Sequence, residues 1–298
     1  MKTFGVIANF DKTDAARTVR DVVSYADELG LTLWLEESIP FQDTDARRCP
    51  ATAFAQKNVE AVVVLGGDGT MLAASHTLSG QGLPLVGFNI GSLGYLTSVE
   101  EASFRDALEQ LRDNQFKIGW RTLLDVRVER KSTPGKRMPE ALNDVVISRG
   151  ISGTAVELDL MLDAQTVSRF LCDGIIVATP TGSTAYSLAA GGPILLPDVE
   201  ALVISPICPH TLTSRPLVVR DRTRITIRAV ACREPMLLSV DGAGDASLEP
   251  GDSVQISKSA RRVPVINLPG YNPCDVMRRK LGWGGHSRSR ESQGSGEK

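Results

Sequence analysis

Apolar runs and amphipathic stretches alternate through the first 117 residues of the chain. Apolar, largely β-branched segments predict strands at 3–8, 31–35, 61–65 and 85–88, and helical periodicity predicts helices at 15–29, 49–57, 71–78 and 102–112. Continuous apolar strands are typical of a parallel sheet covered on both faces. We therefore expect an α/β domain with a parallel, Rossmann-like sheet over residues 1–117, with ligands at the carboxyl ends of its strands.

The hydrophobic pattern changes to a period of two after this domain. Leu124, Val126 and Val128 alternate with charged residues, and short strands follow at 156–160, 224–230 and 236–240. This pattern predicts a mainly antiparallel, β-sandwich-like domain over residues 118–267. We expect the chain to return to the first domain at 268–283 through a helix near 274–281. The last segment, 284–298, lacks apolar residues to bury and is predicted to be disordered.

Composition excludes several classes of protein. The net charge of −2 and the pI near 6.0 favour neither nucleic acid nor a membrane surface as a partner. No apolar run is long enough to span a bilayer, and the N-terminus has no signal-peptide pattern. Five scattered cysteines without a Cys-x-x-Cys pair indicate neither disulfides nor zinc, and three histidines argue against a histidine-rich metal site. We expect a cytoplasmic protein whose metal arrives with a substrate.

The strand predicted at 61–65 ends in the sequence Gly-Gly-Asp-Gly-Thr, residues 66–70. Glycines at a strand-to-helix junction let the backbone approach a ligand closely, and free amides there can face phosphates. The sequence fits neither the Walker A loop nor the Gly-x-Gly-x-x-Gly fingerprint. Taken alone, it is equally explained as a tight turn in which Asp68 caps the next helix.

This loop resembles the signature shared by NAD kinases, diacylglycerol and sphingosine kinases and, more distantly, phosphofructokinases. The resemblance implies phosphoryl transfer to a hydroxyl group. A hydroxyl attacks phosphorus better as it loses its proton, so a positioned carboxylate serves as general base, and Asp68 is the candidate. Charge in the transition state is expected to be neutralised by Mg²⁺ or another divalent cation that is bound to ATP.

A second segment narrows the resemblance to the NAD kinase family. It runs from Asp173 to Ser187 with the sequence DGIIVATPTGSTAYS and is similar to the most characteristic stretch of that family. The likeness continues through 189–194, 209–216 and 280–283, and covers nearly all of residues 3–283. It implies transfer of the γ-phosphoryl group of ATP to the 2′-hydroxyl of the adenosine ribose of NAD, which yields NADP.

The same resemblance implies a set of residues that contact NAD. They are Asp68, Gly69, Tyr95, Asn143, Asp144, Asp173, Thr184, Ala185, Tyr186, Ser187, Leu188 and Ala189, with His210 close to the site. Taken without it, these residues have other interpretations: Tyr95 and Tyr186 as core aromatics, Asn143-Asp144 and Asp173-Gly174 as turns, and His210 as a structural histidine. Asp144 stands where the family has a glutamate, so its reach is one methylene shorter.

Other readings and departures from the family bear on these assignments. Leu171 and Ala243 replace a basic residue and a glutamine found in some relatives, so neither receives a binding role. Ser183 lacks the Gly-x-Ser-x-Gly elbow of a serine hydrolase.

A lipid kinase and a catalytically silent NAD(P)-binding sensor are the two alternative functions. The residues do not distinguish ATP from polyphosphate as donor, and the family's assembly implies a homodimer or homotetramer.

Overall fold

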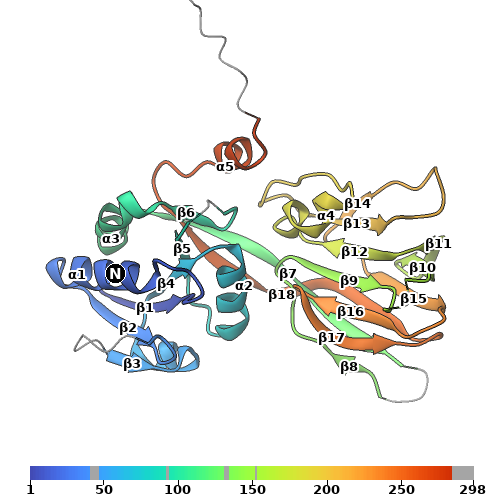
Figure 1. Ribbon diagram of the computed structural model, residues 1–298, viewed down its shortest axis with the longest axis horizontal. Coiled ribbons are helices and arrows are strands. Elements are labelled where there is room, and N and C mark those ends of the chain that lie inside the picture. The colour runs from blue at the N-terminus through green and yellow to red at the C-terminus, as the bar shows by residue number, and fades with distance from the viewer. Residues whose placement is uncertain (41–46, 92–93, 131–133, 152, 284–298) are drawn as a thin grey trace, which may run out of the picture.

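The computed structural model describes residues 1–40, 47–91, 94–130, 134–151 and 153–283, arranged as two lobes side by side (Figure 1). The N-terminal lobe contains β1 (Thr3–Ala8), α1 (Ala15–Glu28), β2 (Thr32–Glu36), β3 (Arg47–Cys49), the 3₁₀ helix η1 (Ala51–Lys57), β4 (Ala61–Gly66), α2 (Asp68–Thr77), β5 (Leu85–Asn89), β6 (Thr97–Val99), the 3₁₀ helix η2 (Glu101–Ser103) and α3 (Phe104–Arg112). The predicted disordered tail, 284–298, lies outside the described residues.

The strands of the N-terminal lobe are parallel, in the order β3-β2-β1-β4-β5. One face packs against α1 and α3 and the other against η1 and α2, because the central strand β4 is apolar and fully buried on both sides. The carboxyl ends of β4 and β5 lead into the two glycine-rich loops. The predicted α/β fold with a parallel sheet is confirmed.

The C-terminal lobe is built from antiparallel strands. It contains β7 (Lys117–Glu129), β8 (Lys136–Arg137), β9 (Asp144–Ser148), β10 (Val156–Leu162), β11 (Gln165–Cys172), β12 (Gly174–Ala178), the 3₁₀ helix η3 (Gly182–Thr184), α4 (Tyr186–Ala189), β13 (Ala201–Ile207), β14 (Leu217–Arg220), β15 (Ile225–Ala231), β16 (Met236–Val240), β17 (Ala243–Leu248) and β18 (Ser253–Asn267). One sheet has the order β14-β13-β12-β9-β16-β17, and its inner face meets β10, β15, β18 and β7 across a shared apolar core. The predicted sandwich-like second half is therefore confirmed.

Side chains of β12 point alternately to the two faces of its sheet, and this explains where the residues after Ala178 lie. Ile175 and Val177 enter the core between the two sheets, whereas Ile176 and Ala178 face the opposite side. There, Ala190 and Leu195 cover them. The segment that follows β12 is thus held over the outer face of the sheet.

Two long strands join the lobes. The first part of β18 pairs with β15 in the C-terminal lobe, and its last part pairs with β5 through Val265 and Leu85. β7 runs antiparallel to β18 along almost its whole length, with a register irregularity between Lys258 and Arg262. The predicted bounds of 118–267 placed both strands in the second domain, but nothing in the sequence pattern predicted that they also extend the first sheet.

The chain then returns to the N-terminal lobe through α5 (Pro273–Lys280), which lies above the junction of the two lobes in Figure 1. Arg279 forms an ion pair with Glu100, and the Lys280 ammonium lies 5.8 Å from the Tyr95 ring centroid. Asn272 accepts a hydrogen bond from the Cys274 N–H and so caps the helix. The return segment therefore contacts the loop that follows β5.

Candidate active site between the lobes

Asp68 is the first residue of α2, directly beyond the carboxyl end of β4. Its carboxylate does not cap the helix. Instead, one oxygen accepts a hydrogen bond from the Tyr95 N–H at 2.9 Å and the other accepts one from the Leu96 N–H at 2.8 Å. The turn-and-cap explanation of the Gly-Gly-Asp-Gly sequence is therefore wrong, because the side chain reaches across to the neighbouring loop.

Glycines make this contact sterically feasible. A Cβ atom at Gly94 would overlap the Asp68 carboxylate, and one at Gly66 would overlap the side chain of Thr70. The helix itself starts earlier than the apolar pattern predicted, at Asp68 instead of Met71, because Gly67 in an extended conformation serves as the N-cap. The loops that follow β4 and β5 are thus joined through the carboxylate of Asp68.

Tyr95 belongs to a small cavity between the lobes. The cavity is lined from the N-terminal lobe by Tyr95 and Leu96, from the C-terminal lobe by Arg121, Pro180, Thr181, Thr184, Leu195 and Pro197, and from the returning segment by Tyr271, Pro273, Val276 and Met277. Burial, followed by the negative charge of Asp68, raises the pKa of the Tyr95 hydroxyl. Tyr95 is therefore not a core aromatic but faces the predicted catalytic carboxylate and Thr184.

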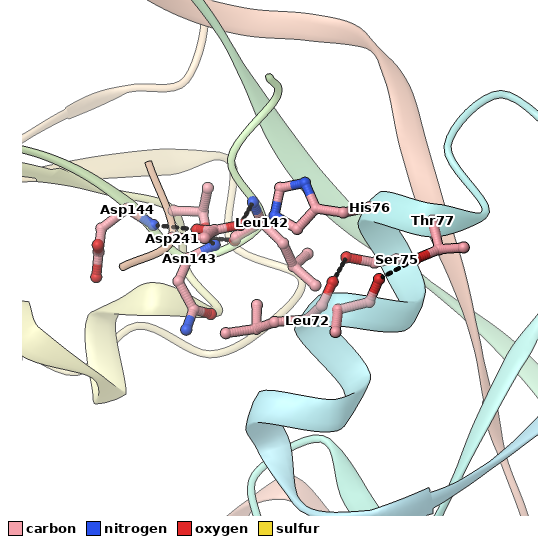
Figure 2. A network of polar contacts seen from close by, with 10 residues as sticks. Leu72, Ser75, His76, Thr77, Leu142, Asn143, Asp144 and Asp241 are labelled. Atoms are coloured by element: carbon pink, nitrogen blue, oxygen red, sulfur yellow. Dashed lines mark hydrogen bonds and ion pairs between the residues drawn. The ribbon is translucent and has the colours of Figure 1, made fainter. Parts of the chain in front are cut away.

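The segment Leu142-Asn143-Asp144 enters β9 and is held by a carboxylate on another turn. Asp241, which follows β16, accepts hydrogen bonds from all three N–H groups at 2.7, 2.7 and 3.0 Å (Figure 2). Asp241 is only 2% exposed at its side chain. The backbone faces Asp241, whereas the side chains of Asn143 and Asp144 turn away from it (Figure 2).

Asp144 is 5% exposed. Burial, together with the neighbouring charge of Asp241, raises the pKa of Asp144 to about 7. Near neutral pH the carboxyl group is therefore present in both protonation states, so it can donate as well as accept a hydrogen bond. Those are the properties that contact with a ribose hydroxyl requires.

The segment after β12 is fixed by buried hydroxyl groups. Thr179 donates to the Leu142 carbonyl at 2.5 Å, and its N–H donates to the Asn143 carbonyl at 2.9 Å. A Cβ atom at Gly182 would overlap the backbone of Asn143. These contacts place Asn143 directly against the turn that carries Thr184.

Ser183 and Ser187 have structural partners. The Ser183 hydroxyl donates to the Pro180 carbonyl at 2.7 Å and accepts from the Leu195 N–H at 2.9 Å, and the hydroxyls of Ser187 and Ser205 lie 2.9 Å apart. Both residues are fully buried. Tyr186 between them is 47% exposed, so its interpretation as a core aromatic is wrong and its ring is accessible to a ligand.

Asp173 and His210 lie at the other end of β12. Asp144 pairs with Ala178 at the end near the cavity, whereas Gly174 pairs with Ser148, about 13 Å further along the strand. Asp173 forms an ion pair with Arg149 at 3.2 Å, and His210 is exposed. Within one chain, the structure thus brings together the predicted site residues Asp68, Gly69, Tyr95, Asn143, Asp144 and 184–189, and it leaves Asp173 and His210 apart.

Sequence reasoning missed three residues of this region: Asp241, His76 and Arg121. In the sequence, Asp241 and the glycine after it have the pattern of an ordinary Asp-Gly turn. Such a turn is present, and Asp241 has a positive φ of 49° in it. His76 follows Asp68 and Leu72 at intervals of four, which places all three along one side of a helix. Arg121 is 5% exposed, although the alternation of Leu124, Val126 and Val128 puts position 121 in phase with the charged residues; the register irregularity of the β7–β18 pair lies between the two.

Comparisons with known proteins point to one family. The N-terminal domain of ATP-NAD kinases matches residues 4–116, and the C-terminal domain of ATP-NAD kinases matches residues 142–268. The chain is 37% identical over 284 residues to the NAD kinase of Syntrophotalea carbinolica, and these cover 95% of this chain and 99% of that protein. The NAD kinase of Acidobacterium capsulatum gives the same identity and the same coverage.

Solved structures show the same fold. The yeast NADH kinase complexed with NADH superposes with a TM-score of 0.85 at 24% identity and covers 97% of this chain and 90% of that chain. An NAD kinase from Archaeoglobus fulgidus in complex with ATP superposes with a TM-score of 0.69 at 24% identity and covers 95% of this chain and 98% of that chain. At 24% identity, these superpositions show that the chain shares the fold of the two structures.

The raised pKa of Asp144 predicts a pH-dependent stability. Between its ordinary pKa of 3.8 and about 7, the folded protein binds a proton that the unfolded chain releases, so stability falls as the pH rises through this range. Asp144→Asn, which mimics the protonated form, removes this loss, which is on the order of 4 kcal/mol. In thermal unfolding, the difference in Tm between variant and wild type should grow from about pH 4 to pH 7. A difference that stays constant with pH would contradict the assignment.

Proposed function

The chain belongs to the NAD kinase family, and from this premise we propose how its residues transfer the γ-phosphoryl group of ATP to the 2′-hydroxyl of the adenosine ribose of NAD. The observation that carries the proposal is the position of Asp68. Its carboxylate accepts hydrogen bonds from the N–H groups of Tyr95 and Leu96, and these two residues line the cavity between the lobes that Thr184 also lines. A general base for an alcohol acceptor has to lie at such a point, between both substrates.

The chemical step is a single displacement at phosphorus. The 2′-hydroxyl gives its proton to the Asp68 carboxylate, its oxygen forms a bond to the γ-phosphorus, and the bond from that phosphorus to the bridging oxygen breaks to release ADP. The N–H groups of Tyr95 and Leu96 hold the plane of the carboxylate. This fixed orientation supports its role, because proton transfer depends on alignment.

Residues from the C-terminal lobe are proposed to hold the acceptor. Asn143 and Asp144 bind ribose hydroxyls, and the exposed ring of Tyr186 packs against a base or ribose face. Gly69, Thr184, Ala185, Leu188 and Ala189 line the path of the dinucleotide. Ser187 contributes through backbone groups, since its hydroxyl is paired with Ser205.

We propose that the divalent cation enters with ATP. In the described part of the chain, no three His, Cys, Asp or Glu side chains form a metal-binding cluster. A cation carried by the phosphate oxygens needs no such cluster. When bound, it neutralises charge on the transferring phosphoryl group and on the ADP leaving group.

We further propose a homo-oligomer in which Asp173 and His210 serve the site of a second copy. Their distance from Asp144, at the opposite end of β12 within one chain, supports this arrangement. So do large apolar side chains that are exposed on the same lobe, among them Val167 (49%), Leu171 (42%), Leu212 (95%), Leu217 (36%) and Val218 (46%). Exposed apolar surface of this kind is typical of an interface.

The protein is proposed to work in the cytoplasm. All five cysteines are unpaired, which suits a reducing compartment. In the described residues, no helix has the length and apolar character to cross a membrane.

Replacing Asp68 by Asn tests the base. Incubation with NAD, ATP and Mg²⁺ should yield NADP with the wild type, and Asp68→Asn should lower kcat by about 10²- to 10⁴-fold, because the amide takes up no proton. NADP is measured by an NADP-specific dehydrogenase assay, and the fold by thermal unfolding. Asp106→Asn on an exposed face of α3 is the matched control with wild-type activity. Undiminished NADP formation by Asp68→Asn would remove the assigned base.

Gly94→Ala tests the support of that base. The added methyl group overlaps the Asp68 carboxylate and displaces it from the N–H groups of Tyr95 and Leu96. A shift of about 1 Å is expected to cost about 10²-fold in kcat, with little change in the KM for ATP. Steady-state kinetics measures this, and an unaltered kcat in a folded variant would show that the position of the carboxylate is not critical.

Mixing two inactive variants tests the shared site. If Asp173 acts in the partner's site, co-expressed Asp68→Asn and Asp173→Ala chains form mixed oligomers in which one site keeps both residues. NADP formation should then exceed that of either variant alone. Activity equal to the average of the two separate preparations would show that each chain uses its own Asp173.

A further inference from the structure

His76 connects the lobe that carries the proposed base to the lobe that carries the proposed ribose site. It lies on α2, eight residues after Asp68, and its Nε2–H donates to the Asp241 carboxylate at 2.9 Å (Figure 2). Asp241 belongs to the turn between β16 and β17 in the C-terminal lobe. The imidazole is about one-third exposed, at 34%, whereas its partner is buried.

Asp241 transmits this contact to the segment 142–144. The same carboxylate oxygen that accepts from His76 also accepts from the Leu142 N–H, and the other oxygen accepts from Asn143 and Asp144. Asp241 in turn donates its own N–H to the Asp144 carbonyl at 3.0 Å. A movement of His76 relative to Asp241 therefore moves the backbone from which Asn143 and Asp144 project.

The other end of α2 carries Asp68. A helix is stiff over this length, and eight residues span about 12 Å. One end of α2 is thus fixed to the Tyr95 loop through Asp68, and the opposite end is fixed to the C-terminal lobe through His76. The lobes are also linked by β7 and β18, whose register is irregular between Lys258 and Arg262, and by an apolar cluster in which Leu142 packs with Met71 and Ala74 of α2.

We propose that the His76–Asp241 hydrogen bond sets the distance between the Asp68 carboxylate and the segment 142–144, which makes His76 a positioning residue for phosphoryl transfer. The proposal rests on the proposed function of Asp68 and Asn143. His76 itself touches no reacting atom. Its removal leaves each lobe folded and the packing of Leu142 against α2 in place, but takes away the directional contact that aligns α2 with the segment 142–144.

The test compares three variants by steady-state kinetics. His76→Ala removes the donor and should lower kcat about 10-fold or more, raise the KM for NAD and leave the KM for ATP nearly unchanged. His76→Gln keeps an amide N–H donor and should recover most of that loss. Thr77→Ala is the matched control, since the exposed Thr77 hydroxyl donates to the Ala73 carbonyl of the same helix.

Two outcomes overturn the proposal. If kcat and the KM for NAD stay within about twofold of wild type in His76→Ala, the contact is merely structural. If His76→Gln is as impaired as His76→Ala, the imidazole acts by something other than this hydrogen bond. Should His76→Ala fold poorly, His76→Asn, whose amide is too short to reach Asp241, gives the same comparison.

A measurement without turnover separates this inference from the proposed function. Hydrogen exchange followed by mass spectrometry should show faster exchange of the peptide containing Leu142–Asp144 in His76→Ala than in wild type or Thr77→Ala. Unchanged exchange in that peptide overturns the proposed linkage even if NADP is formed. A wild type that makes no NADP removes the proposed function, while the exchange result still decides whether His76 holds the segment.

Discussion

The site depends on backbone N–H groups that hold two carboxylates. Asp68 is oriented by the N–H groups of Tyr95 and Leu96, and Asp241 is surrounded by those of Leu142, Asn143 and Asp144. Hydrogen bonds to a charged acceptor are stronger than those between neutral groups, and a buried carboxylate without them is costly. Each carboxylate therefore fixes the loop that faces it, and these two loops carry Tyr95, Asn143 and Asp144 of the predicted contacts with NAD.

The sheet architecture explains why these loops meet. Parallel strands β4 and β5 bring Asp68 and Tyr95 to one edge, and β9 and β12 bring Asn143 and Thr179 to the edge of a second sheet. β7 and β18 belong to both lobes, and the sheet that contains β9 and β12 packs against them across a shared apolar core, so the position of one edge is fixed relative to the other.

Much of this arrangement was predictable from the sequence, because local patterns determine it. The apolar run at 61–65 indicated a buried parallel strand, and the period-two segments indicated the antiparallel half. The family and the kinase chemistry followed from short motifs whose glycines and hydroxyls have fixed structural roles. Gly66, Gly94 and Gly182 each stand where a Cβ atom would overlap a neighbour, so the structure requires glycine at these three positions of the motifs.

The remaining features depend on contacts between distant residues. His76 and Asp241 are 165 positions apart, and nothing local to either indicates the other. The pKa of Asp144 follows from burial and from the charge of Asp241, which only the folded chain brings close. Likewise, β12 separates Asp173 from Asn143 although both belonged to a single predicted set of NAD contacts. The binding roles of that set stay predictions.

The central claim is that the Asp68 carboxylate accepts the proton of the 2′-hydroxyl. A crystal structure of the protein with NAD and a non-hydrolysable ATP analogue tests it most directly. The account predicts the 2′-oxygen within about 2.6–3.2 Å of an Asp68 carboxylate oxygen and in line with the γ-phosphorus. A bound NAD whose 2′-hydroxyl faces away from Asp68, toward another base, would contradict it.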